Sequence, residues 1–373
     1  MRVLIMTCST GEGHNSCAKA IQQGFEENGV QCDVIDSLQF VSNGFARFFS
    51  WGHATIYRSL PFLFRHGYSY VERHPGVLEE KSFMYKVFAS GMSQFYALLQ
   101  EKKYDTVLCT HVFAGMLLHA TLHKHPMDLR TAFVATDYTC YPGATGIEVQ
   151  QYFIPAANLA DDFVSGGIPA EKIHVSGIPI RKEFYSRTDK AAAKAHFGLK
   201  ADRPHLLMMC GSMGCGPMEE LAKQLAQRMC KRHYLTIVCG TNEKLYKSLT
   251  EKYGYLSNVR ICGFVNEMSL LMDSADLYLT KPGGLSVTEA AAKGLPMVYI
   301  DAVAGCEKHN CRFFVENGGA IAGANVKELT TLCLKLLRDP QKREEMSHRL
   351  DALNICNAPQ RIWDILQEPV TSI

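Results

Sequence analysis

Short apolar runs alternate with helical stretches along most of the chain, and glycine-containing turns separate them. The first run spans residues 2–7 and the next spans residues 32–36, with a helical stretch from about residue 16 to residue 28 between them. Continuous apolar runs of this kind are typical of parallel strands that are covered on both faces. The order strand, helix, strand therefore predicts the opening of a Rossmann-like sheet, in which ligands lie at the carboxyl ends of the strands.

The same alternation restarts near residue 205, after a polar, alanine-rich stretch at residues 187–203 that is typical of a linker. At 373 residues the chain is long enough for two domains that each bury a core. We therefore expect an α/β fold with a first Rossmann-like domain at residues 1–200, a second at residues 201–345 and a C-terminal segment at residues 346–373. The further apolar runs predict strands at residues 105–109, 131–135, 152–155, 173–177, 205–210, 234–239, 259–262, 277–279 and 297–300.

An insertion at about residues 40–100 interrupts the α/β rhythm of the first domain. Residues 40–70 hold ten aromatic side chains, and residues 40–75 hold four arginines against one acid. Aromatic residues interleaved with arginine suit a surface that enters the headgroup region of an anionic membrane. A helical insertion whose aromatic residues pack into a core explains the pattern nearly as well, and both can hold. The expected membrane contacts are Arg47, Phe48, Phe49, Trp51 and Arg58.

Composition excludes several classes of protein. A formal net charge of +2 is too small for a general nucleic-acid binder. The 14 cysteines contain no Cys-x-x-Cys pair, which favours reduced thiols over a disulfide framework or a zinc site. No apolar run approaches the roughly 20 residues of a membrane span, and the N-terminal run is too short for a signal peptide. We therefore expect a cytoplasmic protein.

The most informative stretch runs from residue 276 to residue 310. A short strand leads into the turn Lys281-Pro282-Gly283-Gly284, and a helix begins near Ser286. This arrangement directs backbone N–H groups and the positive end of a helix dipole at one place, which favours an anion such as phosphate. Lys281 adds a positive charge there.

Two further features of this stretch suit a nucleotide sugar. The carboxylate of Glu289, placed early in the helix, can accept both hydrogen bonds of a ribose diol. Glu307 and Asn310 lie in the next loop and can meet another hydroxyl-rich group. The turn alone favours an ordinary strand–helix–strand unit, but Glu289 and the second loop shift the interpretation to a nucleotide-sugar site.

His14 follows the first strand on the turn Gly11-Glu12-Gly13. The glycine spacing matches the dinucleotide fingerprint poorly, because the third glycine is missing. An imidazole with a pKa of about 6.5 is a suitable general base for a hydroxyl group. A histidine at a helix N-terminus without a chemical role is an equally good interpretation of the spacing alone.

Residues 263–319 resemble the donor half of the family of monogalactosyldiacylglycerol synthases and processive diacylglycerol glucosyltransferases. This family belongs to the GT-B glycosyltransferases, which include the MurG-type enzymes. The resemblance rests on Gly263-Phe264-Val265, on the Lys-Pro-Gly-Gly turn and on Gly318-Gly319, and it extends over nearly the whole chain. It implies that Phe264 and Val265 hold uracil, that Glu289 holds ribose, and that the phosphates are held by Gly211, Ser212, Gly214, Lys281, Gly283, Gly284, Leu285 and Ser286.

The resemblance also assigns the sugar and acceptor sites. In the family a Gly-Gln-Glu-x-x-Asn loop holds the transferred sugar, which implies this role for Glu307 and Asn310, with Cys306 in place of the Gln. Because Cys306 replaces the Gln, the identity of the transferred sugar stays open among glucose, galactose and N-acetylglucosamine. His14 would accept the proton of a lipid hydroxyl, in an acceptor site with Gly11, Gly13 and Asp137. Tyr141-Pro142-Gly143 replaces the His and Trp usual after that aspartate.

The resemblance further implies that the insertion contributes to membrane attachment. It also implies that the final helix, which carries Trp363, crosses back onto the first domain.

These features lead to one expected function and several alternatives. We expect an inverting glycosyltransferase that moves a hexose from a UDP-sugar to diacylglycerol at an anionic membrane surface, located peripherally on the inner face. No Asp-x-Asp triplet occurs, so we expect neither a metal nor another cofactor. The alternatives are a MurG-like UDP-GlcNAc transferase with a polyprenyl-linked acceptor, a UDP-sugar epimerase and a non-catalytic UDP-sugar-binding membrane sensor.

Overall fold

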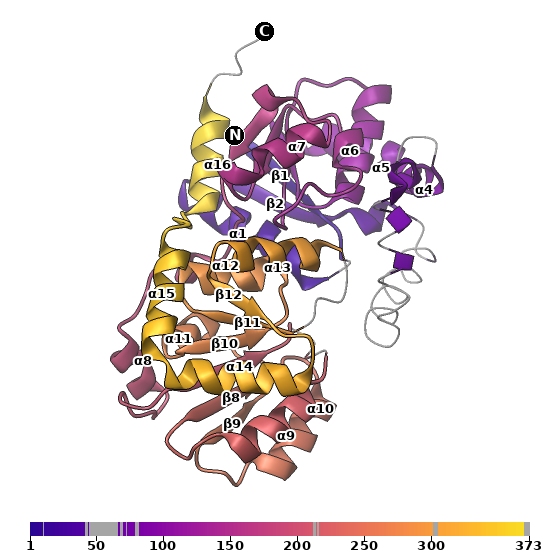
Figure 1. Ribbon diagram of the computed structural model, residues 1–373. Helices are drawn as coiled ribbons and strands as arrows, with labels where there is room; N and C mark the ends of the chain where they lie inside the picture. The colour runs from indigo at the N-terminus through magenta and orange to yellow at the C-terminus, as the bar shows by residue number, and fades with distance from the viewer. Residues whose placement is uncertain are drawn as a thin grey trace. The chain divides into compact units, whose positions relative to one another are not determined.

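The computed structural model describes most of the chain in two compact units (Figure 1). Unit 1 comprises Met1–Lys182, Val303–His309 and Cys356–Ile373, and unit 2 comprises Glu183–Ala302 and Asn310–Ile355. The five expected membrane contacts and Ser212 lie outside the described residues. The described residues are 1–9, 11–41, 44, 66–67, 70–71, 73–78, 82–211, 214, 216–300 and 305–368.

Unit 1 is built on a six-stranded parallel sheet in the order β2-β1-β3-β4-β5-β6. Its strands are β1 Arg2–Thr7, β2 Gln31–Asp36, β3 Thr106–Cys109, β4 Arg130–Val134, β5 Gln151–Ile154 and β6 Ile173–Val175. Its helices are α1 Glu12–Glu27, α4 Phe83–Ala89, α5 Met92–Lys102, α6 Val112–Lys124, α7 Ala160–Ser165 and α16 Ala358–Gln367, with short 3-10 turns at Ser37–Phe40, Pro75–Leu78, Ala144–Gly146, Ala157–Leu159 and Ala170–Lys172.

The apolar runs of unit 1 are covered on both faces, as the sequence predicts. Residues Val3 to Met6 of β1 have no exposed surface, and Ile5 pairs with Val34 on one side and Leu108 on the other. Helices α4 and α5 are separate elements, and Gly91 lies between them. A β-carbon at Gly91 would lie only 2.5 Å from the carbonyl oxygen of Phe40, a close approach that requires glycine.

Unit 2 repeats the architecture with the strand order β12-β11-β10-β7-β8-β9, all parallel. Its strands are β7 His205–Met209, β8 Tyr234–Val238, β9 Val259–Cys262, β10 Leu277–Thr280, β11 Met297–Tyr299 and β12 Ala320–Ala322. Its helices are α8 Lys190–His196, α9 Met218–Arg228, α10 Glu243–Tyr253, α11 Met268–Asp273, α12 Gly284–Ala292, α14 Val326–Arg338 and α15 Pro340–Asp351, with a 3-10 turn at Lys182–Phe184. α13 Cys306–Glu316 begins in unit 1 and continues in unit 2.

The side chains of β10 point alternately to the two faces of the sheet of unit 2. Leu277 and Leu279 enter a core with Leu206 and Met208 of β7, against helices α9 and α14. Tyr278 lies between them in the sequence and therefore points to the opposite face of the sheet, where it is fully buried. Among all described helices, none combines the length and the apolarity of a membrane span.

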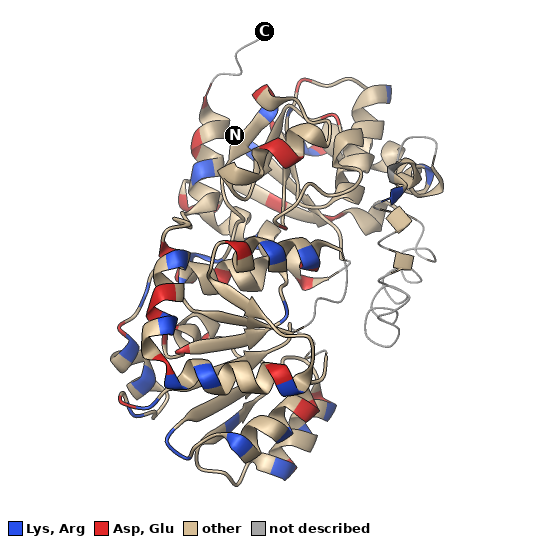
Figure 2. Ribbon diagram, viewed as in Figure 1, with Lys and Arg blue, Asp and Glu red and all other residues tan. Residues whose placement is uncertain are grey.

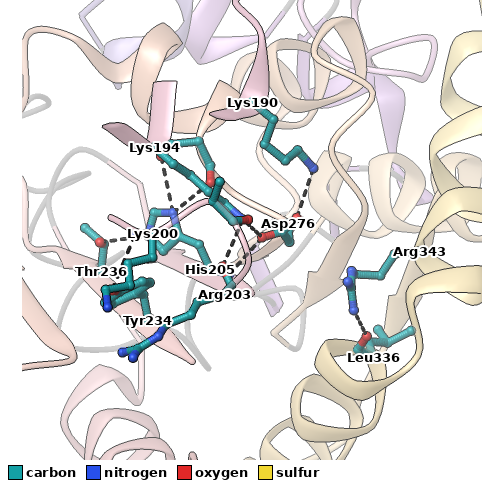
Figure 3. A network of polar contacts seen from close by, with 12 residues as sticks. Lys190, Lys194, Lys200, Arg203, His205, Tyr234, Thr236, Asp276, Leu336 and Arg343 are labelled. Atoms are coloured by element: carbon teal, nitrogen blue, oxygen red, sulfur yellow. Dashed lines mark hydrogen bonds and ion pairs between the residues drawn. The ribbon is translucent and has the colours of Figure 1, made fainter. Parts of the chain in front are cut away.

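The boundary between the units lies at Lys182 and not near residue 200, because the expected linker is bound to unit 2. Nζ of Lys194, a residue that is 3% exposed, lies 2.7 Å from a carboxylate oxygen of Asp276. Lys190 contacts the other oxygen of the same carboxylate at 3.1 Å, and the backbone N–H of His205 donates to the oxygen that Lys194 contacts (Figure 3). An alanine-rich composition does not reveal a lysine that is buried by its partner, so the sequence misplaces this boundary.

The final helix returns to unit 1, as expected. The ring of Trp363 in α16 lies 5.4 Å from the ring of Phe25 in α1, and Nδ2 of Asn28 donates to Gln360 at 2.9 Å. Helix α1 approaches Pro359 so closely that a β-carbon at Gly24 would lie 2.5 Å from its Cβ. The returning segment begins at Cys356 and not at residue 346, because α15 stays in unit 2.

Candidate functional site

The carboxyl ends of β1 and β3 form the topological switch point of unit 1. The chain leaves β1 toward β2 on one side and later returns to β3 on the other, so the loops after β1 and β3 diverge and leave a crevice. A pocket of about 320 Å³, its open mouth included, lies here. Its lining residues are His14, Thr110, His111, Val112, Phe133, Ala135, Thr136, Asp137, Thr139 and Tyr141.

His14, the third residue of α1, is half-buried in this pocket, and backbone geometry sets its tautomer. Its Nδ1 lies 2.8 Å from the carbonyl oxygen of Thr110 and 3.1 Å from Oγ1 of Thr136. Because a carbonyl oxygen only accepts, Nδ1 must carry the proton, and the lone pair of the ring lies on Nε2. This is the tautomer that a general base needs.

Neighbouring side chains fix the loop that carries His14. The hydroxyl of Thr7, the last residue of β1, donates to Oδ1 of Asn15 at 3.0 Å, and Nδ2 of Asn15 donates to the hydroxyl of Ser9 at 3.1 Å. The backbone N–H of Thr110 donates to the carbonyl of Met6 at 2.9 Å. The start of α1 is therefore tied to the ends of both central strands.

His111 is a pocket residue that sequence reasoning missed. Its Nδ1 accepts a hydrogen bond from the backbone N–H of Phe113 at 3.1 Å, so it caps the N-terminus of α6. The ring is 6% exposed, and its centroid lies 4.4 Å from that of His14, with an angle of 78° between the planes. Its position two residues after the end of a parallel strand was the available signal.

The three expected acceptor positions all lie at this edge of the sheet. Asp137 follows β4 and lines the pocket, and its negative charge adds to burial in raising the pKa of the Cys17 thiol in α1. Gly11 is the N-cap of α1 and provides no side-chain cap, and Gly13 is the second residue of that helix. Neither glycine is part of the pocket lining, although Gly13 directly precedes His14 in the sequence.

In unit 2 the switch point lies between β7 and β10, and both glycine turns of the sequence end up there. Gly211 lies two residues after the end of β7 and has φ of +70°, and a β-carbon at this position would lie 2.7 Å from Cε of Lys281. Gly214 has φ of +56°, and a β-carbon there would lie 2.6 Å from the carbonyl of Cys239. Both positions therefore require glycine, and the Lys281 side chain lies across the first turn.

The N-terminus of α12 has the features of an anion site. Gly283 is its N-cap and offers no side-chain hydrogen bond, so the N–H groups of Gly284, Leu285 and Ser286 rely on another acceptor. Glu289 is the sixth residue of the helix and lies in the second turn, slightly later than expected. At a spacing of three residues, Glu289 and Ser286 lie on the same side of α12.

Asn310 holds the Lys281–Gly283 turn through a hydrogen bond to its backbone, a role that the sequence did not reveal. Its Nδ2 donates to the carbonyl oxygen of Pro282 at 3.0 Å, and the residue has no exposed surface. Glu307, in the first turn of α13, is 7% exposed, and Cys306 is half-buried.

The loop after β9 presents an aromatic ring. Phe264 is 70% exposed, while Val265 is half-buried. An exposed ring at the carboxyl end of a parallel strand is suited to stacking on a flat ligand.

A larger hollow of about 1450 Å³, its open space included, lies elsewhere on unit 2, among α9, α14 and α15. Arg228, Lys335 and Arg338 are part of its lining, and none of the strand-end residues is. Its position away from both switch points excludes it as the candidate site.

Two family models match the chain. The model for monogalactosyldiacylglycerol (MGDG) synthase matches residues 14–180, which begin at His14. The model for glycosyl transferases group 1 matches residues 218–350, which include α12 and the loop after β9.

Comparison with whole proteins extends the similarity over nearly the full length. A processive diacylglycerol beta-glucosyltransferase of Staphylococcus saprophyticus is 29% identical over 366 residues, covering 95% of this chain and 89% of the relative. The crystal structure of MurG from Acinetobacter baumannii superposes with a TM-score of 0.63 at 18% identity, covering 98% of this chain and 99% of that chain. A UDP-GlcNAc 2-epimerase from Neisseria meningitidis gives the same TM-score at 15% identity, covering 98% and 99%.

The structural neighbours establish the GT-B fold but do not choose between transferase and epimerase chemistry. The family models and the sequence relatives favour transferase chemistry, because the models describe MGDG synthase and glycosyl transferases and the relatives are named glucosyltransferases. The chain is thus similar over nearly its full length to processive diacylglycerol beta-glucosyltransferases, and its residues 14–180 match the model for monogalactosyldiacylglycerol (MGDG) synthase.

Proposed function

We propose that the chain is an inverting glycosyltransferase that moves a hexose from a UDP-sugar to diacylglycerol at a membrane surface. The observation that carries the proposal is the tautomer of His14, whose Nδ1–H donates to the Thr110 carbonyl and whose lone pair therefore lies on Nε2 inside the pocket of unit 1. The names of the sequence relatives support diacylglycerol as the acceptor.

The donor binds in unit 2 at the switch point between β7 and β10. Phe264 and Val265 hold the uracil, and Glu289 accepts the hydrogen bonds of the ribose diol. The diphosphate lies against the N–H groups at the start of α12, the Gly211 turn and Lys281, whose side chain already lies across that turn. Helix dipole, backbone amides and one ammonium group then stabilise the charge of the leaving group without a bound metal.

The acceptor hydroxyl binds in the pocket of unit 1. Nε2 of His14 removes its proton while the oxygen attacks the anomeric carbon, and the bond between that carbon and the UDP oxygen breaks. The electron pair leaves with the diphosphate. One displacement inverts the anomeric centre and yields UDP and a β-glycosyl diacylglycerol.

The identity of the hexose depends on Glu307 and Asn310, with Cys306 beside them. The name of the Staphylococcus relative favours glucose. We place the enzyme peripherally on the membrane, because diacylglycerol resides there, and the aromatic–arginine insertion is the expected attachment.

The test is transfer to liposomes that contain diacylglycerol, with labelled UDP-glucose, UDP-galactose or UDP-GlcNAc as donor. Labelled glycosyldiacylglycerol with one of these donors supports the proposal. Transfer only to a polyprenyl diphosphate would identify a MurG-like enzyme, and conversion of the free donor without lipid would identify an epimerase. Binding of the donor without any product would identify a sensor.

A further inference from the structure

The pocket of unit 1 contains two imidazole rings in edge-to-face contact. The centroids of His14 and His111 lie 4.4 Å apart, and the planes make an angle of 78°. The two residues follow β1 and β3, which are neighbours in the sheet and flank its switch point. The contact is therefore set by the pairing of the central strands.

The two rings have opposite hydrogen-bonding characters. Nδ1 of His14 donates to the Thr110 carbonyl, which places the lone pair of that ring on Nε2. Nδ1 of His111 accepts from the Phe113 N–H, which places the proton of the neutral ring on Nε2. The backbone thus holds each neutral ring through Nδ1, which places a lone pair on Nε2 of His14 and a proton on Nε2 of His111.

We propose that His111 recognises the oxygen on the carbon atom next to the attacking hydroxyl and so determines which alcohols are glycosylated. The inference rests on the proposed function, and it names the feature of the acceptor that the site recognises. In 1,2-diacylglycerol the attacking hydroxyl is on carbon 3 and an ester oxygen is on carbon 2. His14 takes the proton of the first oxygen while Nε2–H of His111 donates to the second.

The contact between the rings suits this pair of oxygens. The ring centroids lie 4.4 Å apart, so the two rings can contact two atoms that are close neighbours. Oxygens on adjacent carbons are such a pair. His111 is 6% exposed, so water has little access to replace the bond when the second oxygen is missing. A buried donor of this kind discriminates more strongly against an analogue that lacks its partner than an exposed donor does.

Two substitutions separate the role of Nε2 from the cap that Nδ1 provides. In His111→Asn the amide oxygen occupies the place of Nδ1 and keeps the cap of α6, because asparagine is a preferred N-cap residue, but the group at Nε2 is lost. In His111→Gln the longer side chain carries its amide N–H to the place of Nε2 and gives up the cap. His119→Asn is the matched control, since His119 is also a buried histidine of α6 but lies outside the pocket lining.

The experiment compares two acceptors in mixed micelles with labelled UDP-glucose. One is 1,2-diacylglycerol, and the other is a 1-acyl-1,3-propanediol with an alkyl chain on carbon 2 in place of the ester. We expect the wild type and the His119→Asn variant to prefer diacylglycerol by about tenfold in kcat/KM. His111→Asn should abolish this preference by losing activity on diacylglycerol alone, and His111→Gln should retain it.

A merely structural role of His111 would lower activity on both acceptors equally and leave their ratio unchanged, which would overturn the inference. An unchanged ratio in His111→Asn with full activity would overturn it as well. Failure of the wild type to glycosylate diacylglycerol at all would instead contradict the proposed function.

Discussion

The side chain of Lys281 lies across the backbone of Gly211, so closely that a β-carbon at the glycine would stand 2.7 Å from Cε of the lysine. The two residues follow β10 and β7, the strands that flank the switch point of unit 2. A positive charge from one strand end is therefore seated on the amide-lined turn of the other, where the proposed diphosphate binds.

Gly211→Ala should weaken UDP binding by about tenfold, because its methyl group displaces Lys281. The left-handed backbone at φ of +70° adds a loss of roughly 1 kcal/mol in the free energy of unfolding. Gly198→Ala is the matched control, since its φ is +69° and no atom lies within 4 Å of the added carbon. Calorimetry with UDP and urea unfolding separate the two effects, and equal UDP affinities in both variants would contradict the contact.

His14→Ala should lower the rate of transfer by about 10² to 10⁴-fold, the usual contribution of a general base. Its affinity for UDP should stay at the wild-type value, because the proposed donor contacts all belong to other residues. Turnover with labelled UDP-glucose tests the expected loss of rate, and calorimetry with UDP tests the expected unchanged affinity. Loss of UDP binding would rule out a role confined to the acceptor.

Glu289→Ala should weaken UDP binding by about 1.5 to 3 kcal/mol, the usual range for hydrogen bonds to a charged group. The wild type should prefer UDP over 2′,3′-dideoxy-UDP, and the variant should bind both alike. Competition calorimetry with the two nucleotides measures this directly. A variant that still prefers the ribose form would place the diol contact elsewhere.

Lys194→Met should destabilise unit 2 by roughly 3 kcal/mol, because it leaves the carboxylate of Asp276 buried with less compensation. Burial alone would raise the pKa of that carboxyl, but Lys190 and Lys194 together hold it below its ordinary value. Lys190→Met removes the more exposed partner, whose side chain is 52% exposed, and should cost less than about 1 kcal/mol. Equal losses in urea unfolding would contradict this ranking.

His205 should make the stability of the fold depend on pH below neutrality. Burial lowers the pKa of its imidazole to about 4, and the neutral ring lies 3.1 Å from the Ser274 carbonyl and 2.8 Å from the Thr236 hydroxyl. Between about pH 6.5 and pH 4 the unfolded chain binds a proton here that the folded chain does not. The contribution, about 3 kcal/mol, is therefore complete above pH 6.5 and is lost as the pH falls.

Measuring the pH dependence of stability in the His205→Asn variant checks that His205 is the group responsible. Unfolding free energies from pH 7.5 to 4.5 should fall with a slope that is smaller by one proton in the variant. Parallel curves for the two proteins would show that another group is responsible.

The sequence was sufficient for the fold, while the roles assigned to the site residues stay predictions. Continuous apolar runs and glycine turns locate the strands, because a doubly covered strand needs the first and a strand-to-helix turn at a switch point needs the second. The resemblance implied the GT-B arrangement of two such domains. Single contacts between distant segments were out of reach. Neither the burial of Lys194 by Asp276 nor the support of Pro282 by Asn310 follows any local pattern.

His111 shows why site residues are harder to predict than strands. Its role depends on the register of β1 and β3, which places its ring against that of His14. A histidine after a strand is common, and only the neighbouring strand gives it a partner.

The return of α16 to α1 makes unit 1 discontinuous in the sequence, with most of unit 2 encoded between its parts. During synthesis the sheet of unit 1 therefore emerges long before α16, the helix that packs on α1. The contact between Phe25 and Trp363 can form only after unit 2 has been synthesised. Because α1 also carries His14 at its start, the helix of the proposed base gains this packing partner at its other end only when α16 docks. The order of translation thus leaves the helix of the proposed base partly uncovered until the domain for the donor already exists.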